Sequence, residues 1–337
     1  MKIERIPYSQ INILEEIARG GYGIVYKAIW NAKKVAIKKF FRHKYFLDEL
    51  ESHYKCCGCG CINRCYGFVE DPKTNDCMLV LQFAEGGDLH NRLRNKFSEI
   101  TWKEKIEIFS QISIGLKSIH TRDFIHRDMH SGNVLLLYLE EPIIQCKTNK
   151  KWQIGDLGLT RPANMPENNI YGVIPYIAPE IFIRSSFSKN SDVYCMGMIM
   201  WELTTGCKPF ANVEHDHTLI YKIIDGERPK ITEDTPECYA NLMKRCWNSD
   251  PEKRPSITDI RKTIDSWDSE KYIAQFNKSE IKRKELISSK RLGPKFSEEN
   301  HPKAIYTSRL LSFDSISLSS LTNEQEYISK ENEFDIL

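Results

Sequence analysis

A short stretch at residues 126 to 133 constrains this chain more than any other feature. It places Asp128 and Asn133 five positions apart, with Arg127 and His130 beside the aspartate. Phosphoryl transfer needs little covalent chemistry from a protein, but it needs a carboxylate to orient the attacking hydroxyl and oxygen ligands for a metal ion beside the phosphates. One short loop can supply both, so the stretch favours phosphoryl transfer over a plain surface turn.

A glycine-rich turn lies upstream, at residues 17 to 26, between two strand-like runs. Its glycines are Gly20, Gly21 and Gly23. Their bare backbone can close over phosphates, although glycine-containing hairpins are common and the turn alone is a weak signal. An apolar strand at residues 35 to 38 then ends on Lys38, which is either a phosphate ligand or a solvated lysine at a strand end.

Further motifs lie downstream. Residues 154 to 158 place Asp156 beside glycines, and residues 178 to 180 read Ala-Pro-Glu. Asp192 precedes a strongly apolar helical stretch, where it could merely favour the helix N-terminus. Each motif is ambiguous by itself, but their order along the chain is highly specific.

In this order the motifs resemble those of the eukaryotic protein kinases, over about residues 8 to 267. The resemblance implies an α+β, bilobal kinase-like fold with a small β-rich N-lobe at residues 1–83 and a larger helical C-lobe at 84–267. Composition shifts at residues 268–337 to a charged, serine-rich tail, which we expect to be largely disordered, with a lysine-rich helix conceivable at 279 to 291. This tail is either a solvated linker or an autophosphorylation or docking segment.

The resemblance also implies roles for single residues. Asp128 would accept the proton of the substrate hydroxyl, Lys38 would pair with the phosphates of ATP, and Asn133 and Asp156 would hold Mg²⁺. The partner of Lys38 is expected to be Glu49, or else Glu51, because the interval from the lysine is shorter than is usual in the family.

The remaining expected contacts surround the nucleotide and the catalytic loop. The residues expected around the nucleotide are Ile17, Ala18, Gly20, Gly21, Gly23, Val25, Ala36, Lys38, Leu81, Gln82 and Ala84. Leu81 would lie at the back of the adenine pocket, and the backbones of Gln82 and Ala84 would bond the purine edge. Arg127 would either receive a phosphate on Tyr171, face the carboxylate of Glu167, or make a structural contact.

The nature of the acceptor is less clearly marked. Small-molecule kinases share part of the loop motif, but they do not explain Glu180 or Asp192. The resemblance to protein kinases implies that Asp192 tethers the backbone of the catalytic loop, and that Glu180 pairs with Arg254 of a Cys-Trp...Arg-Pro segment. The overall pattern is similar to the tyrosine-kinase-like group, especially to a lineage-expanded fungal family, most of whose members act on Ser/Thr. A protein Ser/Thr substrate is therefore expected, with tyrosine left open.

Four departures from the family pattern support an alternative, an ATP-binding pseudokinase that acts as a signalling scaffold. They are Ala18, His130, Leu157 and Val173. None removes a charged group that the chemistry requires, so an active kinase is the primary hypothesis. Because an unperturbed histidine titrates near neutrality, His130 predicts activity that rises as the pH falls toward about 6.

Composition limits the partners. A formal net charge of +2 gives no indication of a nucleic-acid partner, and no apolar run approaches the ~20 residues of a membrane span. The N-terminus lacks a secretory signal, so we expect an intracellular, cytoplasmic protein. Five of the 11 cysteines fall within residues 56 to 65. They form either a site for a soft metal ion or a loop of variable sequence. Their spacing matches no standard zinc knuckle.

Overall fold

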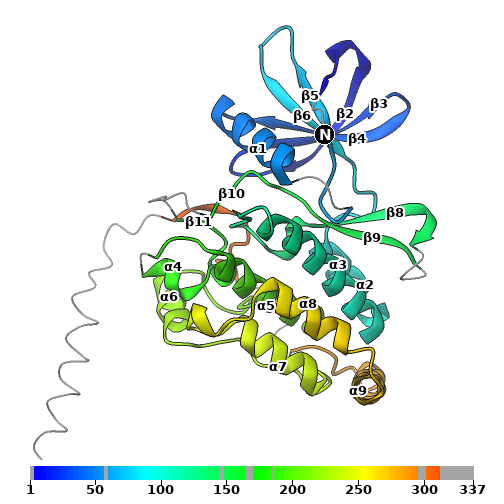
Figure 1. Cartoon of the computed structure of the whole chain (residues 1–337), viewed down its shortest axis with the longest axis vertical. Coiled ribbons are helices and arrows are strands. Elements are labelled where there is room, and N and C mark those ends of the chain that lie inside the picture. The colour runs from blue at the N-terminus through cyan, green and yellow to red at the C-terminus, as the bar shows by residue number, and fades with distance from the viewer. Residues whose placement is uncertain are drawn as a thin grey trace, which may run out of the picture.

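The computed structural model describes residues 4–56, 60–143, 148–163, 170–183, 185–294 and 301–311. They form a β-sheet lobe above a helical lobe, with the hairpin of β8 and β9 beside the junction (Figure 1). The expected bilobal α+β fold is therefore confirmed.

The N-lobe is a six-stranded sheet with the strand order β1-β5-β6-β4-β3-β2. Its strands are β1 (Glu4–Arg5), β2 (Ile11–Arg19), β3 (Gly23–Trp30), β4 (Lys33–Phe40), β5 (Cys65–Glu70) and β6 (Cys77–Gln82). The β1–β5 pair is parallel and the other pairs are antiparallel. Helix α1 (His43–Cys56) packs against β4 and β6.

The alternation of side chains along β4 positions its lysine. Val35 and Ile37 belong to the small core on one face of the sheet, whereas Ala36 and Phe40 belong to the core that includes Phe46 of α1. Because successive strand residues point to opposite faces, Lys38 shares the α1 face with Ala36 and Phe40.

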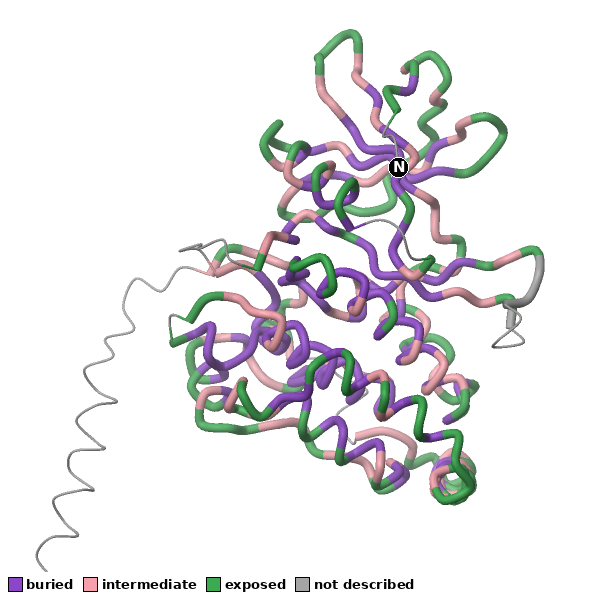
Figure 2. The backbone as a smooth tube through the Cα atoms, in the orientation of Figure 1, coloured by how far each residue is buried: buried purple, intermediate pink, exposed green. Residues whose placement is uncertain are grey.

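The C-lobe is built from helices around one large apolar core. They are α2 (Leu89–Lys96), α3 (Trp102–His120), α4 (Pro179–Phe182), α5 (Lys189–Thr205), α6 (His217–Ile224), α7 (Glu237–Cys246), α8 (Ile257–Ser266) and α9 (Glu270–Ser288). Short 3₁₀ turns are η1 (Tyr8–Gln10) in the N-lobe, and η2 (Phe97–Glu99), η3 (Ser131–Asn133), η4 (Ile174–Tyr176) and η5 (Pro251–Lys253) in the C-lobe. Helix α5 is buried around its circumference, begins at a Ser188 capping box and ends at Gly206 in the left-handed region, φ +73° (Figure 2).

Between the lobes lie short two-stranded pairs that carry the candidate site. They are β7 (Phe124–Ile125) with β10 (Arg161–Pro162), β8 (Val134–Ile143) with β9 (Thr148–Ile154), and β11 (Ile170–Gly172) with β12 (Arg309–Leu311). The last pair joins two segments that are far apart in the sequence, and Figure 1 shows it as an orange strand beside β11.

The expectation of a disordered tail from residue 268 is wrong for the parts of it that the structure describes. Helix α9 begins at Glu270, earlier than the helix considered at 279 to 291, and buries Phe276 and Leu286. Burial of these apolar side chains offsets the conformational entropy that is lost when the helix forms. A count of the charged residues in the segment does not reveal this contribution. Residues 301–311 also pack on the C-lobe, whereas 295–300 and 312–337 lie outside the described residues.

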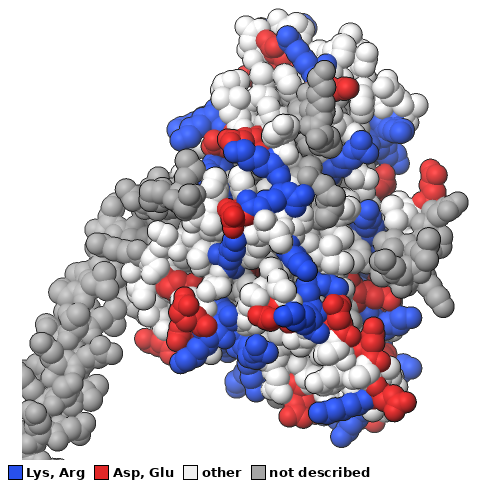
Figure 3. Space-filling view, in the orientation of Figure 1, with Lys and Arg blue, Asp and Glu red and all other residues white. Residues whose placement is uncertain are grey.

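Charged side chains of both signs are interspersed over the face shown in Figure 3. Within the described ranges, no helix is long and apolar enough to cross a membrane.

Candidate active site

Lys38 is buried at the centre of an ionic cluster. Its Nζ is 2.7 Å from Glu49 Oε2 and 2.7 Å from Asp156 Oδ1. Glu49 is fully buried, whereas Glu51 is exposed and pairs with Lys55. Glu49 is therefore the partner of Lys38, and β4, α1 and the segment after β9 meet at one ammonium group.

The charges in this cluster stabilise one another. Burial opposes the charged form of Lys38, but the carboxylates of Asp156 and Glu49 outweigh it and raise the pKa of Lys38. Burial likewise opposes ionisation of Asp156, yet the Lys38 ammonium and the Gly158 N–H lower the pKa of Asp156 to about 2. Both groups are therefore ionised at neutral pH.

Asp192 holds the backbone of the loop that carries Asp128. Its Oδ2 accepts the N–H of His126 at 2.8 Å, and its Oδ1 accepts the N–H of Arg127 at 2.9 Å. His120 Nε2 lies 2.8 Å from the same carboxylate. Arg127 has φ +72°, an unusual value for a non-glycine residue, and these bonds help to stabilise that conformation. Asp192 thus does more than favour a helix terminus.

Asp128, His130 and Asn133 lie together in this loop. The Asn133 Nδ2 donates to the backbone carbonyl of Asp128 at 2.9 Å, which orients the amide and leaves its oxygen as an acceptor. His130 Nε2 lies 3.8 Å from Asp128 Oδ2, while His130 Nδ1 accepts the N–H of Gly132 at 3.1 Å. Burial lowers the pKa of His130, but the nearby Asp128 carboxylate outweighs it, and the net shift is upward.

Two contacts near this loop are not predicted by the sequence. Glu202 of α5 accepts hydrogen bonds from the hydroxyl groups of Ser131, at 2.7 Å, and Tyr176, at 2.5 Å. Burial raises the pKa of Glu202 to about 7. A single glutamate in an apolar helix was the available signal, because such a residue needs buried partners. The carboxylate connects the catalytic loop to the 3₁₀ turn η4.

The second missed contact involves the tail. Ser308 Oγ lies 2.8 and 2.7 Å from the two carboxylate oxygens of Asp128. The serine is 180 residues away in sequence, so only the folded chain brings the two together.

The glycine-rich turn lies over the site, but its glycines meet different constraints. A Cβ at Gly23 would lie 2.0 Å from the Lys39 carbonyl oxygen, so close strand pairing excludes a side chain there. A Cβ at Gly20 would meet nothing within 4 Å. Ile17 and Ala18 are exposed on β2. The small residue at Gly23 is therefore explained by strand packing as well as by the phosphate contact expected there.

The segment expected to bind adenine follows β6. Ala36 and Leu81 are buried, pair across β4 and β6, and lie on the same core face. Val25 is half-buried beside them. The N–H of Gln82 donates at 2.8 Å to the carbonyl of Arg64, the residue before β5. This N–H is therefore committed, and only the carbonyl of Gln82 could contact a purine.

Other sequence expectations have mixed outcomes. The Arg127 guanidinium lies 4.6 Å over the Phe187 ring, a packing contact that agrees with the structural alternative for this residue. The Tyr171 ring contacts the Tyr22 ring with centroids 5.7 Å apart.

Glu167 lies outside the described residues, as do two cysteines of the expected cluster, at positions 57 and 59. In the part of the chain that the structure describes, no group of three or more His, Cys, Asp or Glu could hold a metal.

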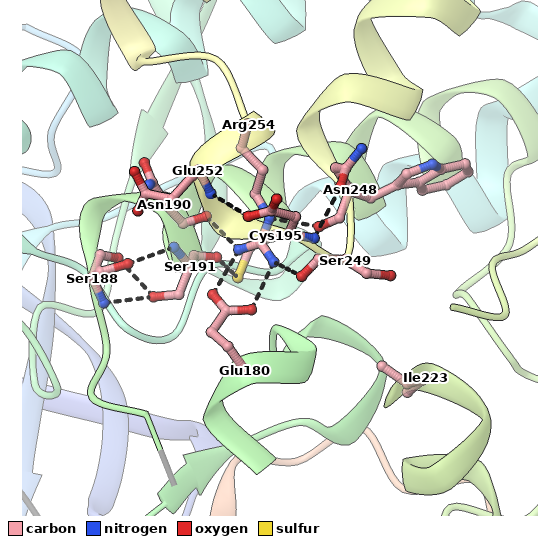
Figure 4. Close-up of polar contacts among 12 residues, drawn as sticks. Glu180, Ser188, Asn190, Ser191, Cys195, Ile223, Asn248, Ser249, Glu252 and Arg254 are labelled. Carbon is pink, nitrogen blue, oxygen red and sulfur yellow. Dashed lines mark hydrogen bonds and ion pairs between the residues drawn. The ribbon is translucent and has the colours of Figure 1, made fainter. Parts of the chain in front are cut away.

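The helical lobe contains the expected pair of Glu180 with Arg254. The Arg254 guanidinium donates to both carboxylate oxygens of Glu180, at 2.7 and 2.6 Å, and its side chain is fully buried. Figure 4 shows the arginine pointing down between the labelled Asn190 and Ser249 toward Glu180. The same guanidinium donates to the Asn190 carbonyl at 3.0 Å. This bidentate pair fixes α4 and the segment after β11 against the rest of the lobe.

Known proteins that are similar to this chain in sequence are protein kinases. Residues 11–264 match the family described as protein tyrosine and serine/threonine kinase. The chain is 29% identical over 289 residues to a probable serine/threonine-protein kinase roco5 of Dictyostelium discoideum, covering 77% of this chain and 10% of that protein. It is 31% identical over 273 residues to mitogen-activated protein kinase kinase kinase 7 of Homo sapiens, covering 78% of this chain and 43% of that protein.

A third relative, mitogen-activated protein kinase kinase kinase 7 of Drosophila melanogaster, is 30% identical over 264 residues, with 76% of this chain and 37% of that protein covered. The chain thus spans less than half the length of these relatives. The family match nevertheless extends across both lobes and every motif described above. The chain therefore belongs to the protein tyrosine and serine/threonine kinase family.

Proposed function

We propose that this chain transfers the γ-phosphoryl group of ATP to serine and threonine hydroxyls of proteins. The proposal rests on the cluster of Lys38, Glu49 and Asp156. The Lys38 Nζ lies 2.7 Å from a carboxylate oxygen of each acid, and the three residues come from elements of both lobes. An ammonium group has three protons, and these two contacts leave one for a phosphate oxygen. A scaffold that binds ATP could use the same cluster, so phosphate transfer and not ATP binding separates the two functions.

The oxygen donors at the site fit Mg²⁺. Asp156 is ionised and its side chain is 41% exposed, and Asn133 offers an amide oxygen, so both are ligands that a hard cation prefers. When bound, Mg²⁺ neutralises negative charge on the phosphates. Asp128 orients the acceptor hydroxyl and takes its proton, while Lys38 holds the phosphate chain.

The nucleotide contacts follow from the backbone after β6. The Gln82 carbonyl and the Ala84 N–H are the groups proposed to bond the purine edge, against the apolar face of Ala36 and Leu81. Ile17, Ala18 and Val25 would cover the nucleotide from above, together with Gly20, Gly21 and Gly23.

The proposed acceptor class rests on the names of the relatives reported above. One is named a probable serine/threonine-protein kinase, and another a mitogen-activated protein kinase kinase kinase. A protein substrate is consistent with the Glu180–Arg254 pair in the helical lobe. Membership of a lineage-expanded fungal family within the tyrosine-kinase-like group, and a cytoplasmic location, remain parts of this proposal.

The test is transfer of labelled phosphate from ATP with Mg²⁺ to a generic protein acceptor, followed by phosphoamino-acid analysis. Asp128→Asn should lower the rate at least about a hundredfold, because a positioned base contributes 10²–10⁴. Asp268→Asn, at an exposed position between α8 and α9, is the matched control and should match wild type.

Equal rates in Asp128→Asn and wild type would contradict the role of Asp128. If wild type binds ATP in a thermal-shift assay yet transfers no phosphate, the scaffold alternative replaces the proposal. Phosphotyrosine alone in the product would correct the acceptor class.

A further inference from the structure

The segment at residues 301–311 runs along the C-lobe and enters the candidate active site. Strand β12 pairs antiparallel with β11, with Leu310 opposite Tyr171 and Arg309 opposite Gly172. Addition of a strand to an exposed edge is a common way to hold an extended peptide, because backbone hydrogen bonds fix its direction and register. The segment therefore lies as a peptide substrate would lie on β11.

Side chains anchor the residues that precede β12. The Tyr306 hydroxyl donates to the Pro209 carbonyl at 2.8 Å, and the Tyr306 ring meets His215 edge to face, with centroids 4.7 Å apart. The Ile305 N–H donates to His215 Nδ1 at 3.1 Å. Lys208 Nζ lies 4.5 Å from the Tyr306 ring. These contacts depend on particular side chains, so the segment has one defined position on the C-lobe.

A second group of contacts fixes the start of the segment. The His301 N–H donates to the Ala211 carbonyl at 2.7 Å, and Lys303 forms an ion pair with Glu214 at 2.9 Å. The anchors thus extend from residue 301 to β12.

This position of the segment brings one hydroxyl group to the catalytic carboxylate. Ser308 Oγ lies within 2.8 Å of both carboxylate oxygens of Asp128, the geometry expected of an acceptor hydroxyl about to lose its proton. A Cβ at Gly21 would lie 3.2 Å from the Ser308 carbonyl oxygen, so the glycine-rich turn closes directly over this residue. The neighbouring Thr307 is exposed. Because a slip of one residue would turn Ser308 away, the β11–β12 register selects this serine.

We propose that Ser308 is an intramolecular phosphoacceptor of this kinase. Because the step uses the activity proposed above, it stands only if that activity does. A lone pair on Ser308 Oγ forms the new bond to the γ-phosphorus of ATP, and the bond from that phosphorus to the bridging oxygen breaks. Its electron pair leaves with ADP, and the hydroxyl proton passes to Asp128 and then to solvent.

The reaction should occur once per chain. Phosphoserine carries a charge of about −1.5 to −2 at neutral pH. Placed against the Asp128 carboxylate this charge is repelled, so the modified segment leaves the site. Because donor site and acceptor belong to one chain, the rate is set by an effective concentration and not by the protein concentration.

The experiment incubates the whole 337-residue chain with ATP and Mg²⁺ and maps phosphate by mass spectrometry over time, at several protein concentrations. We expect early incorporation of one phosphate at Ser308, with a first-order rate constant that does not change on dilution. Ser308→Ala should lose this phosphopeptide and most of the early incorporation, whereas the matched control Thr307→Ala should retain both.

A generic protein acceptor, assayed with the same wild-type preparation, separates the two proposals. Phosphorylation of the acceptor without phosphate on Ser308 overturns the inference and leaves the proposed function standing. A Ser308 rate that rises in proportion to protein concentration overturns the intramolecular step. Transfer to neither the acceptor nor Ser308 overturns both proposals.

Discussion

At the scale of single residues, the site depends on neighbours that set protonation and orientation. Lys38 is buried, yet it stays charged because the Asp156 carboxylate lies 2.7 Å away, and the same ammonium group keeps Asp156 ionised. His130 follows the same principle, since its raised pKa results from the carboxylate of Asp128 outweighing burial. A charge at His130 is therefore conditional on pH, unlike that of a lysine.

The first prediction concerns this histidine. Because its pKa lies above the ordinary value, His130 is protonated at low pH and loses its charge as the pH rises through that raised pKa. Lys208 and Glu202 also act on this ring, one lowering and the other raising the pKa. If the charge supports transfer, kcat toward a protein acceptor should fall as the pH rises through that raised pKa.

His130→Lys should keep its charge over the same range and remove the decline, while His130→Gln should be slow and independent of pH. Steady-state rates of the three proteins from acid to mildly alkaline pH provide the measurement. A level profile for wild type together with a faster His130→Lys enzyme would exclude titration of His130.

At the scale of elements, helices of the C-lobe carry polar residues for two different purposes. Asp192 and Glu202 of α5 are buried and satisfied by the catalytic loop, so their burial serves the site. Lys105 of α3 is also fully buried, but its Nζ faces the rings of Trp102, at 4.6 Å, and Phe97, at 4.7 Å. Burial lowers the pKa of Lys105 to about 7.

This lysine provides the second prediction. A pKa that is depressed in the folded state means that the unfolded chain binds more protons between pH 7 and the ordinary lysine value. Burial of this lysine destabilises the folded state to its full extent below about pH 7. As the pH rises above 7, the destabilisation decreases by roughly 1.4 kcal/mol per pH unit. Lys105→Met, which keeps an unbranched chain against the two rings, should therefore raise the Tm at pH 7.

The difference in Tm between Lys105→Met and wild type should shrink when the pH is raised from neutral to alkaline, as followed by thermal unfolding. Lys103→Met, on the exposed face of the same helix, controls for loss of charge and should leave the Tm nearly unchanged. A gain at pH 7 that stays constant with pH would show that packing and not protonation is responsible.

At the scale of the whole molecule, α9 and residues 301–311 make the chain after the last matched residue part of the folded body. Glu280 of α9 accepts the N–H of Trp102 at 3.0 Å, and Arg283 donates to the Ser98 carbonyl at 2.9 Å. The Phe276 ring also contacts the Trp102 ring, with centroids 6.1 Å apart. The helix thus covers the start of α3, which would otherwise be exposed.

The third prediction compares two shortened chains. A chain that ends at residue 294 keeps α9, whereas one that ends at residue 268 loses it. Burial of a large apolar side chain is worth about 1.5–3 kcal/mol, so loss of Phe276 and Leu286 should lower the Tm by roughly 5–10 °C. Differential scanning calorimetry of both chains and the full chain measures this effect, and equal Tm values for the two shortened chains would show that α9 contributes nothing to stability.

The sequence by itself determined the chemistry of the site. Asp128 and Asn133 lie on one short loop, so their proximity follows from chain connectivity, and the alternation along β4 places Lys38 on a defined face. Residue type and short spacing are sufficient to predict such local features.

Only the tertiary structure decided the partners that come from elsewhere in the chain. Glu49 and Glu51 lie about 200° apart around a helix, so the rotation of α1 against the sheet selects the partner of Lys38. The Gln82 N–H donates to the carbonyl of Arg64, the residue before β5, and Ser308 reaches Asp128 across 180 residues through a pairing of three residues per strand. Such contacts are set by packing and by the balance of burial against chain entropy over the whole fold, which no local pattern in the sequence specifies.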